Sequence, residues 1–320
     1  MSSRVGAMSV ALAGALLALF AVAAPTEAET TAEIAPVQFG ARAGKTVAAY
    51  ESYESRVGPA YQVSNARLYY LWDQPFPDAT ATWARDGGRK VFMSVRPKRM
   101  NGSLVLWSEI AAARPDSPLY RQMQAWATRI KDFGAPVYFT FNHEPETAAS
   151  KSNGTPAEYI EAWQNFFNVL ELEGVENAEY VFIGTAFGFG RGQAQKYYPG
   201  DSYVDAIGAD AYNWYNCRPG ITNSWFSMKQ LVDRMMPFAA LHPDEDLMLP
   251  EFGTTEDPAD PDRKAQWFAD AQGLFKTPPY DRFVLINEYD TLKGCAFRPD
   301  SSTASLAAFK IWLQDPYYSG

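Results

Sequence analysis

Histidine and cysteine are scarce in this sequence, which has two of each in 320 residues. Catalytic zinc sites need at least three ligands of these types or carboxylates, grouped at short spacings. His143 and His242 lie far apart with no cysteine cluster nearby, and no Ser-His-Asp arrangement is visible. We therefore predict neither a metal nor any other cofactor.

Long apolar runs are also missing, except at the N-terminus. There Arg4 precedes an apolar stretch, Met8–Ala24, and small residues follow at Ala21–Ala23 and Thr26–Ala28 as possible cleavage sites. This order is typical of a secretory signal peptide. A permanent membrane anchor is the alternative, but the run has no charged stop-transfer flank. The sequence predicts a signal peptide over residues 1–28, and a secreted protein with no membrane attachment after cleavage.

An excess of positive charge is missing too, since the formal net charge is −9. An acidic chain disfavours nucleic acids and polyanionic substrates as partners. The glycine-containing turn Gly40–Lys45 lacks the G-x-G-x-x-G spacing and the complete Walker pattern, so nucleotide binding has little support. These absences favour a monomeric exported protein that acts on a neutral substrate.

The two cysteines, Cys217 and Cys295, each follow a strand-like run. An exported protein forms disulfides readily, so the pair is a disulfide candidate. Two unpaired buried thiols are the alternative, because the sequence alone does not give the distance between them.

The rest of the chain alternates between short strand-like runs and longer segments with helical spacing. This alternation over residues 36–320 predicts one (β/α)8 TIM barrel, with a doubly wound open sheet as the competitor. The expected strands are 37–40, 66–72, 90–95, 136–141, 180–185, 204–209, 247–250 and 283–286. The expected helices are 45–56, 79–85, 119–133, 156–172, 226–240, 261–274 and 302–313, with a poorly defined one after the fifth strand.

Carboxylates follow two of these strands. The fourth runs into Asn142-His143-Glu144-Pro145, and the seventh into Glu251-Phe252-Gly253. Catalytic residues of such barrels lie at the C-terminal ends of the strands. Two facing carboxylates, one protonated and one ionised, are what glycoside hydrolysis requires. Glu144 and Glu251 are the predicted pair. Glu146 and Glu288 remain rivals, and a salt bridge at the barrel rim is the structural alternative.

These two stretches resemble clan A of the glycoside hydrolases, in which an acid/base Glu ends strand four and a nucleophile Glu ends strand seven. A His before the acid/base is characteristic of family 26, the β-mannanase family, although Pro145-Glu146 departs from its pattern. The resemblance implies that Glu144 is the acid/base and Glu251 the nucleophile of a retaining enzyme. It also implies that Tyr212 bonds the nucleophile, with rim packing as the alternative.

Further polar and aromatic side chains are expected to bind substrate around this pair. Arg96 either lowers the pKa of a carboxylate, binds sugar or forms a salt bridge, and Arg67 is another possible partner of Glu251. Asp210 contacts a sugar hydroxyl or an arginine. Aromatic faces stack on sugar rings, which makes Trp72 and Trp214 the preferred platforms over Trp107 and Trp225. The complete predicted substrate-binding set is Asn142, His143, Tyr212, Trp214, Trp72, Arg96, Asp210 and Glu288.

The sequence thus predicts a secreted retaining glycoside hydrolase of a β-linked polysaccharide or oligosaccharide, with a mannan-type substrate favoured. A clan A enzyme for xylan, mixed-linkage glucan or a cell-wall glycan is one alternative. A carbohydrate-binding barrel without activity is another. Linkage, and endo or exo action, stay open.

Overall fold

The structure of the chain is a computed structural model that describes residues 36–58, 61–217, 223–292 and 294–319. The predicted signal peptide, residues 1–28, lies outside these residues. The strands are β1 (Val37–Arg42), β2 (Asn65–Leu71), β3 (Lys90–Arg96), β4 (Val137–Phe141), β5 (Ala178–Thr185), β6 (Ala206–Asn213), β7 (Asp246–Thr254), β8 (Phe283–Tyr289) and β9 (Tyr318–Ser319).

The α-helices of the described residues are α1 (Val47–Val57), α2 (Ala79–Asp86), α3 (Trp107–Ala112), α4 (Pro118–Phe133), α5 (Pro156–Leu172), α6 (Ala186–Gly190), α7 (Met228–Val232), α8 (Met236–Ala239), α9 (Arg263–Leu274) and α10 (Thr303–Leu313). Short 3₁₀ turns are η1 (Lys151–Asn153), η2 (Ala194–Tyr197), η3 (Asp201–Tyr203), η4 (Tyr280–Arg282) and η5 (Pro299–Ser301).

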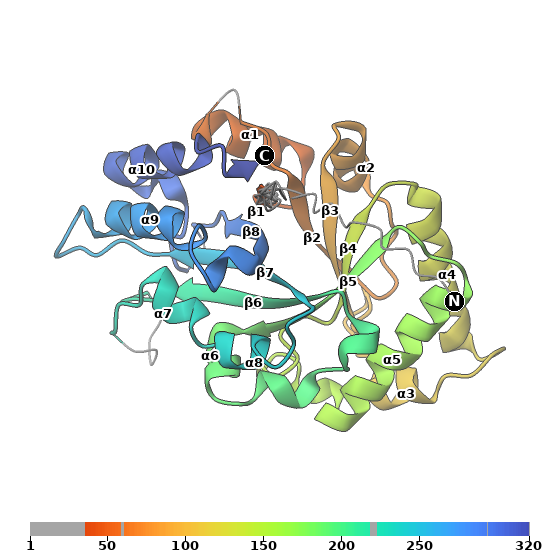
Figure 1. Cartoon of the computed structure of the whole chain (residues 1–320). Coiled ribbons are helices and arrows are strands. Elements are labelled where there is room, and N and C mark those ends of the chain that lie inside the picture. Colours follow the sequence, from red (N-terminus) through yellow and green to blue (C-terminus); the bar gives the residue numbers. More distant parts are fainter. Residues whose placement is uncertain (1–35, 59–60, 218–222, 293, 320) are drawn as a thin grey trace, which may run out of the picture. The chain divides into compact units, whose positions relative to one another are not determined.

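The strands β1 to β8 form a closed parallel barrel with the helices around it (Figure 1). Each strand pairs with the next in chain order, and β1 closes the ring by pairing with β8 on one side and β2 on the other. The short β9 lies beside β1 outside this ring. The predicted (β/α)8 barrel is confirmed, and the open doubly wound sheet is excluded.

The barrel interior has an apolar end and a polar end. The apolar cluster comes mostly from the N-terminal halves of the strands and comprises Phe92, Tyr138, Val181, Ile183, Ala206, Met248 and Leu285. A second, larger core packs the outward side chains of the strands against the helices. Buried polar residues such as Arg67, Asp210 and Glu251 follow along the strands toward their C-terminal ends. This end is where TIM-barrel sites lie.

Local sequence fixes the start of α5, which follows the loop that leaves β4. The Thr155 hydroxyl accepts a hydrogen bond from the Glu158 amide at 3.4 Å. The Glu158 carboxylate in turn accepts from the Thr155 amide at 2.7 Å. This reciprocal cap, with Pro156 at the first helical position, satisfies donors that a helix start leaves unpaired.

Two expectations about element length are corrected. Strands β6, β7 and β8 extend through Asn213, Thr254 and Tyr289, past residues 209, 250 and 286, at which we expected them to end before the polar residues that follow. Polar side chains can face the barrel mouth while their backbone still pairs, so polarity did not mark the strand ends. The helix expected over 226–240 is two short helices, α7 and α8, and Pro237 lies in the first turn of the second.

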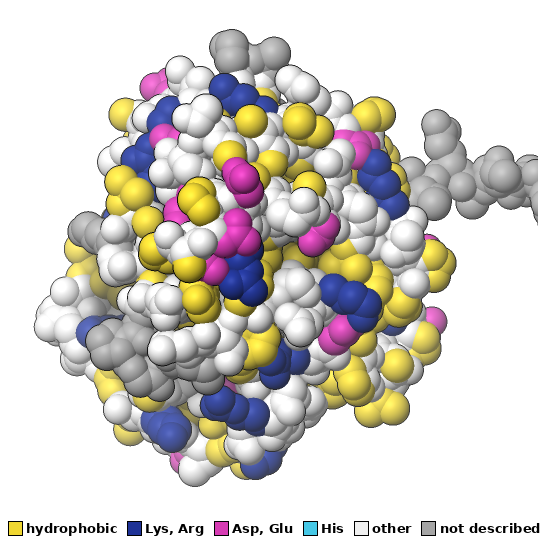
Figure 2. All heavy atoms as spheres, turned by 90° about the vertical axis from the view of Figure 1, so that its left-hand side faces the viewer, with side chains coloured by type: hydrophobic (Ala, Val, Ile, Leu, Met, Phe, Trp, Pro, Cys, Tyr) yellow, Lys and Arg dark blue, Asp and Glu magenta, His cyan; other side chains and the backbone are white. Residues whose placement is uncertain are grey.

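In the part of the chain that the structure describes, no helix combines the length and the apolar character needed to cross a bilayer. Figure 2 shows the side of the barrel where α7, α9 and α10 lie. Acidic and basic side chains are interspersed on this face, with hydrophobic ones scattered between them. This face therefore presents no extended field of one sign to a polyelectrolyte.

Candidate active site

Glu144 follows β4 on a sharply turned backbone. Asn142 and Glu144 both have left-handed conformations, with φ of 45° and 52°. This region is uncommon for residues with a Cβ. The Asn142 amide donates to the Val95 carbonyl at 2.9 Å. The Glu144 amide donates to the Ile183 carbonyl at 2.8 Å. The strands on either side, β3 and β5, thus hold the turn that places Glu144 at the mouth.

Glu251 lies on β7 and is surrounded by hydrogen-bond donors. The Tyr212 hydroxyl donates to Glu251 Oε2 at 2.7 Å, and the Tyr69 hydroxyl donates to Oε1. The fully buried Arg67 guanidinium lies 3.3 Å from Oε1. Burial, and then the charge of Glu251, raises the pKa of both tyrosines, so they remain protonated donors. Two hydrogen bonds and one ion pair thus hold a carboxylate that is only 5% exposed.

Glu144 lies among acidic side chains instead. Burial, and then the negative charges of Glu251 and Glu146, raises the pKa of Glu144 to about 8. Burial and the charges of Glu251 and Glu144 also raise the pKa of Asp210, on β6, well above its usual value. A hydrogen bond between the two carboxyl groups contributes to both pKa values, and their ligand atoms lie within 4.8 Å of each other. Such a pair retains a proton at neutral pH, because both groups cannot ionise side by side.

His143 is a neutral side chain beside this pair. Its Nδ1 lies 2.6 Å from Ser94 Oγ, and its ring centre lies 5.2 Å from that of Tyr69. Burial, and then the charges of Arg67 and Arg96, lowers the pKa of His143 well below its usual value. His143 is therefore a fixed hydrogen-bonding group, and the half-buried Arg96 contributes positive charge at the end of β3.

Both carboxylates line one cavity of about 390 Å³. Its wall is formed by Glu144, Tyr212, Trp214, Glu251, Tyr289, Thr291, Gly294, Cys295 and Phe297. The fold thus brings together four predicted site residues from β4, β6 and β7: Glu144, Glu251, Tyr212 and Trp214. The aromatic side chains beside the two acids suit the stacking of sugar rings.

A disulfide fixes the wall of this cavity. Cys217 and Cys295 are bonded, with their Cα atoms 5.2 Å apart. The bond joins the segment that follows β6 to the segment that follows β8. Phe297 of the latter segment stacks on Tyr212, with ring centres 4.9 Å apart and planes at 25°.

Comparison with known proteins relates this arrangement to one family. Residues 118–254 match the model of the family described as "Glycosyl hydrolase family 26". The matched stretch runs from α4 to the end of β7 and includes both Glu144 and Glu251. Over this stretch the chain is similar to glycosyl hydrolase family 26.

Solved structures described as family 26 enzymes share the fold of this chain. The catalytic domain of the endo-β-1,4-mannanase of Bacillus sp. JAMB-750 superposes with a TM-score of 0.65 at 16% identity, over 89% of this chain and 87% of that one. A family 26 β-mannanase of Bacteroides ovatus has a TM-score of 0.61 at 16% identity, over 88% and 90%.

Among curated proteins, "Endoglucanase H" of Acetivibrio thermocellus is 24% identical over 261 residues, which is 78% of this chain. The chain spans only 27% of the length of that relative.

Glu146, the rival to Glu144, is held away from the cavity wall. Its Oε1 accepts hydrogen bonds from the Thr185 amide and hydroxyl, both at 2.7 Å. The Thr185 hydroxyl also accepts from the Gly188 amide at 2.8 Å and so caps α6. Glu146 thereby stabilises the end of β5. It does not line the cavity that Glu144 and Glu251 share.

Glu288 does not lie at the mouth, which corrects the expectation that it binds substrate. Successive side chains of a strand point to opposite faces. Tyr289 lines the cavity, so its neighbour Glu288 points out of the barrel, where it is fully buried. Burial, and then the charge of Asp290, raises the pKa of Glu288 well above its usual value.

Trp72 is corrected as well, because it is a core residue with 1% of its surface exposed. Its ring packs 5.4 Å from Phe166, and its Nε1 donates to Gln122 at 2.7 Å. Asn142 is only 3% exposed, and its amide nitrogen donates to the Ser150 hydroxyl at 3.3 Å. Both side chains therefore support the loops of the mouth, and neither lines the cavity.

Other tryptophans considered as platforms also have packing contacts. Trp107 is fully buried, with its ring 5.1 Å from that of Tyr159. Trp225 lies under the Arg263 guanidinium, 4.5 Å from its ring centre. Of the four candidate platforms, Trp214 is the one that lines the cavity.

Sequence reasoning missed Tyr69, Tyr289 and Phe297. For Tyr69 a signal existed, since Arg67 and Tyr69 are two apart on one strand and so share the inner face. Tyr289 lies two residues after Asn287 on β8, so these two side chains also point to the same face of their strand. Phe297 lies in a loop, and its place beside Tyr212 depends on tertiary packing.

One group of side chains in the described residues has metal-ligand spacing. Donor atoms of His143, Glu144 and Asp210 lie within 4.8 Å of one another. A divalent cation bound there would replace the proton that Glu144 retains, so it would compete with an acid role for that residue. The predicted absence of a metal remains a prediction.

Proposed function

We propose that the chain is a retaining glycoside hydrolase that cleaves a β-linked polysaccharide or oligosaccharide, with Glu144 as acid/base and Glu251 as nucleophile. The observation that carries the proposal is the contrast between the two carboxyls in one cavity. Glu144 has a pKa raised to about 8, whereas Glu251 accepts hydrogen bonds from Tyr69 and Tyr212 beside Arg67.

In the first step Glu251 attacks the anomeric carbon, and the bond from that carbon to the leaving oxygen breaks. Glu144 donates its proton to the leaving oxygen, so the departing sugar leaves as an alcohol. The product on the enzyme is an ester between the sugar and Glu251.

In the second step a water molecule attacks the anomeric carbon of this ester. Glu144, now ionised, takes a proton from the water, and Glu251 leaves as a carboxylate. The hydroxyls of Tyr69 and Tyr212 hold Glu251 in both states, because each keeps its proton.

We favour mannan as the substrate, on the strength of the family 26 mannanases of similar fold. A β-glucan is the second candidate, because the curated relative is named an endoglucanase. The test is reducing-sugar release from mannan, mixed-linkage glucan, cellulose and xylan under identical conditions. Release from mannan above the others supports the first choice, and release from glucan alone favours the second.

The stereochemical claim has its own test. Proton NMR during hydrolysis shows whether the first product has the β configuration, as retention requires. An initial α product would contradict the ester intermediate. Binding of a glycan without sugar release would instead indicate a carbohydrate-binding barrel that lacks activity.

We also propose that the protein is exported after removal of residues 1–28 and works as a monomer. N-terminal sequencing of protein recovered from culture medium, together with its mass in solution, tests both points. Intact protein in the membrane fraction would instead indicate that the N-terminal apolar stretch is a permanent membrane anchor.

A further inference from the structure

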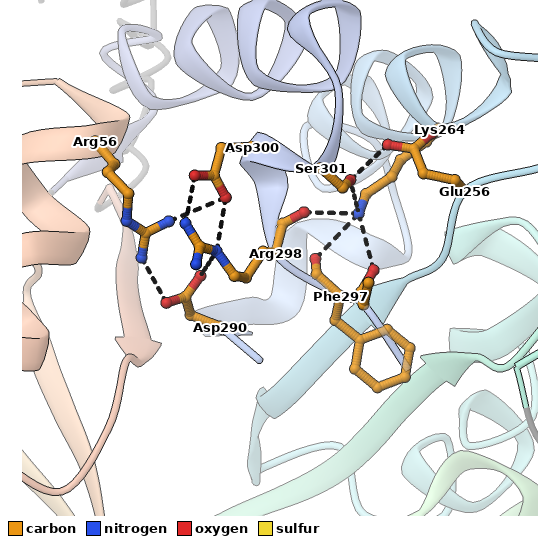
Figure 3. A network of polar contacts seen from close by, with 9 residues as sticks. Arg56, Glu256, Lys264, Asp290, Phe297, Arg298, Asp300 and Ser301 are labelled. Carbon is orange, nitrogen blue, oxygen red and sulfur yellow. Dashed lines mark hydrogen bonds and ion pairs between the residues drawn. The ribbon is translucent and has the colours of Figure 1, made fainter. Parts of the chain in front are cut away.

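Lys264, on α9, is a fully buried lysine outside the cavity. Its Nζ donates to the carbonyls of Arg298 at 2.8 Å and Phe297 at 3.2 Å and to the Ser301 hydroxyl at 2.9 Å. The Ala296 carbonyl lies at 3.4 Å as a weaker acceptor. An ammonium has three N–H donors, so this site uses all of them (Figure 3).

Nearby acids keep this ammonium charged in spite of its burial. Burial lowers the pKa of Lys264 to about 8, while the charges of Glu256, Glu288 and Asp300 oppose that shift. The Ser301 hydroxyl donates to Glu256, which extends the network to the loop after β7. A buried ammonium is tolerated only with such complete pairing, so the groups around it are held in place.

Lys264 binds a single stretch of chain, residues 294–301, which we call the wall segment. This segment includes Cys295, which is bonded to Cys217, and Phe297, which lines the cavity. Within the described residues Lys264 itself does not line the cavity. Its contact with the site therefore runs through the backbone of the wall segment.

Phe297 connects the wall segment to the predicted nucleophile. Its ring stacks on Tyr212 at 4.9 Å, and the Tyr212 hydroxyl donates to Glu251 at 2.7 Å. The ring also lies against Gly253, where an added Cβ would approach Phe297 Cγ to 2.7 Å. Glycine at this position lets the ring lie close to β7, two residues beyond Glu251.

We propose that Lys264 is a positioning residue: it holds the wall segment so that Phe297 fixes Tyr212, and Tyr212 fixes Glu251. The inference rests on the proposed function for its kinetic consequences, but the positioning itself does not depend on a substrate. Loss of the ammonium leaves two or three backbone carbonyls without a donor, and the wall segment shifts to find others.

The first test compares Lys264→Met with Lys276→Met. Lys276 follows α9 and pairs with Asp315, and among the described residues no hydrogen bond or ion pair joins it to the wall segment. We expect Lys264→Met to lower kcat about tenfold or more and to change KM less than about threefold. The reason is that the substitution displaces the nucleophile but leaves the substrate-binding contacts in place. Lys276→Met is expected to leave both constants unchanged. Lys264→Arg, which restores a cationic donor, is expected to recover part of kcat.

A double-mutant cycle tests the route through Phe297. If Lys264 acts through that ring, the double variant Lys264→Met/Phe297→Leu is no slower than Phe297→Leu alone. Independent, multiplicative losses would overturn the route. An unchanged kcat in Lys264→Met, with an active wild type, would overturn the inference itself.

Amide hydrogen exchange separates this inference from the proposed function. The amides of residues 295–298 are expected to exchange at least about tenfold faster in Lys264→Met than in Lys276→Met, with no substrate present. Equal exchange in the two variants would overturn the positioning role. If the wild type hydrolyses no glycan but exchange still differs, the proposed function fails and the positioning role stands.

Discussion

The two sides of the cavity differ in what surrounds their carboxyl groups. On the β2 and β7 side, Glu251 forms an ion pair with Arg67 and accepts hydrogen bonds from Tyr69 and Tyr212. On the β4 side, the charges that act on Glu144 are mainly negative, and its pKa is raised to about 8. Two residues of one chemical type thus have different surroundings in one cavity, and the surroundings of Glu144 raise its pKa.

This difference follows from the strands on which the side chains around each carboxyl group lie. Donors on alternate positions of β2 and β6 converge on β7, because inward side chains of a closed sheet share one interior. Glu144, in the turn after β4, instead lies beside the carboxyl group of Asp210. The contrast predicts which substitutions abolish activity and which only shift its pH dependence.

The largest effect is expected from Glu251→Ala. Without the nucleophile no ester forms, and kcat falls at least about 10⁴-fold. Steady-state hydrolysis of the preferred glycan measures the loss. A residual rate within about tenfold of wild type would mean that the donor-rich side does not hold the nucleophile.

Glu144→Gln is expected to cost about 10²-fold to 10⁴-fold in kcat on natural glycans. A general acid works only while protonated, so wild-type activity should fall as the pH rises through about 8, the pKa of Glu144. In the variant this alkaline limb should disappear. An alkaline limb that persists unchanged in Glu144→Gln would assign the acid to another residue.

Tyr69→Phe removes one donor from Glu251 and is expected to lower kcat about tenfold to 100-fold, the effect of one hydrogen bond to a charged group. Tyr53→Phe is the matched control. The Tyr53 hydroxyl is buried without a hydrogen-bond partner in the described part of the chain. Equal effects of the two substitutions would show that burial, and not donation to Glu251, explains the loss.

The smallest effect is expected from Glu146→Gln, which keeps an oxygen to accept from Thr185 but removes a negative charge near Glu144. Because that charge helps to raise the pKa of Glu144, the alkaline limb should move to lower pH. The rate at the optimum should stay within about threefold of wild type. A loss comparable to that of Glu144→Gln would make Glu146 the acid, contrary to its contacts with Thr185.

The sequence by itself determined the barrel and the pair of carboxylates. Alternating strand-like and helical segments set the number of βα units. The carboxylates that follow apolar runs in the sequence singled out Glu144 and Glu251 as the candidate pair. Tyr212 followed from the family resemblance, and its hydrogen bond to Glu251 is present in the structure. Such patterns can be recognised in the sequence because hydrophobic periodicity is a property of neighbouring residues.

Tertiary structure decided the direction and environment of the individual side chains. Trp72 and Glu288 looked like mouth residues, but helix packing buries the first and strand alternation turns the second outward. Phe297 and Lys264 gave no local signal, because their contacts join segments that are distant in the chain. The raised pKa of Glu144 depends on its burial and on the charge of Glu251 on β7, both of which only folding provides.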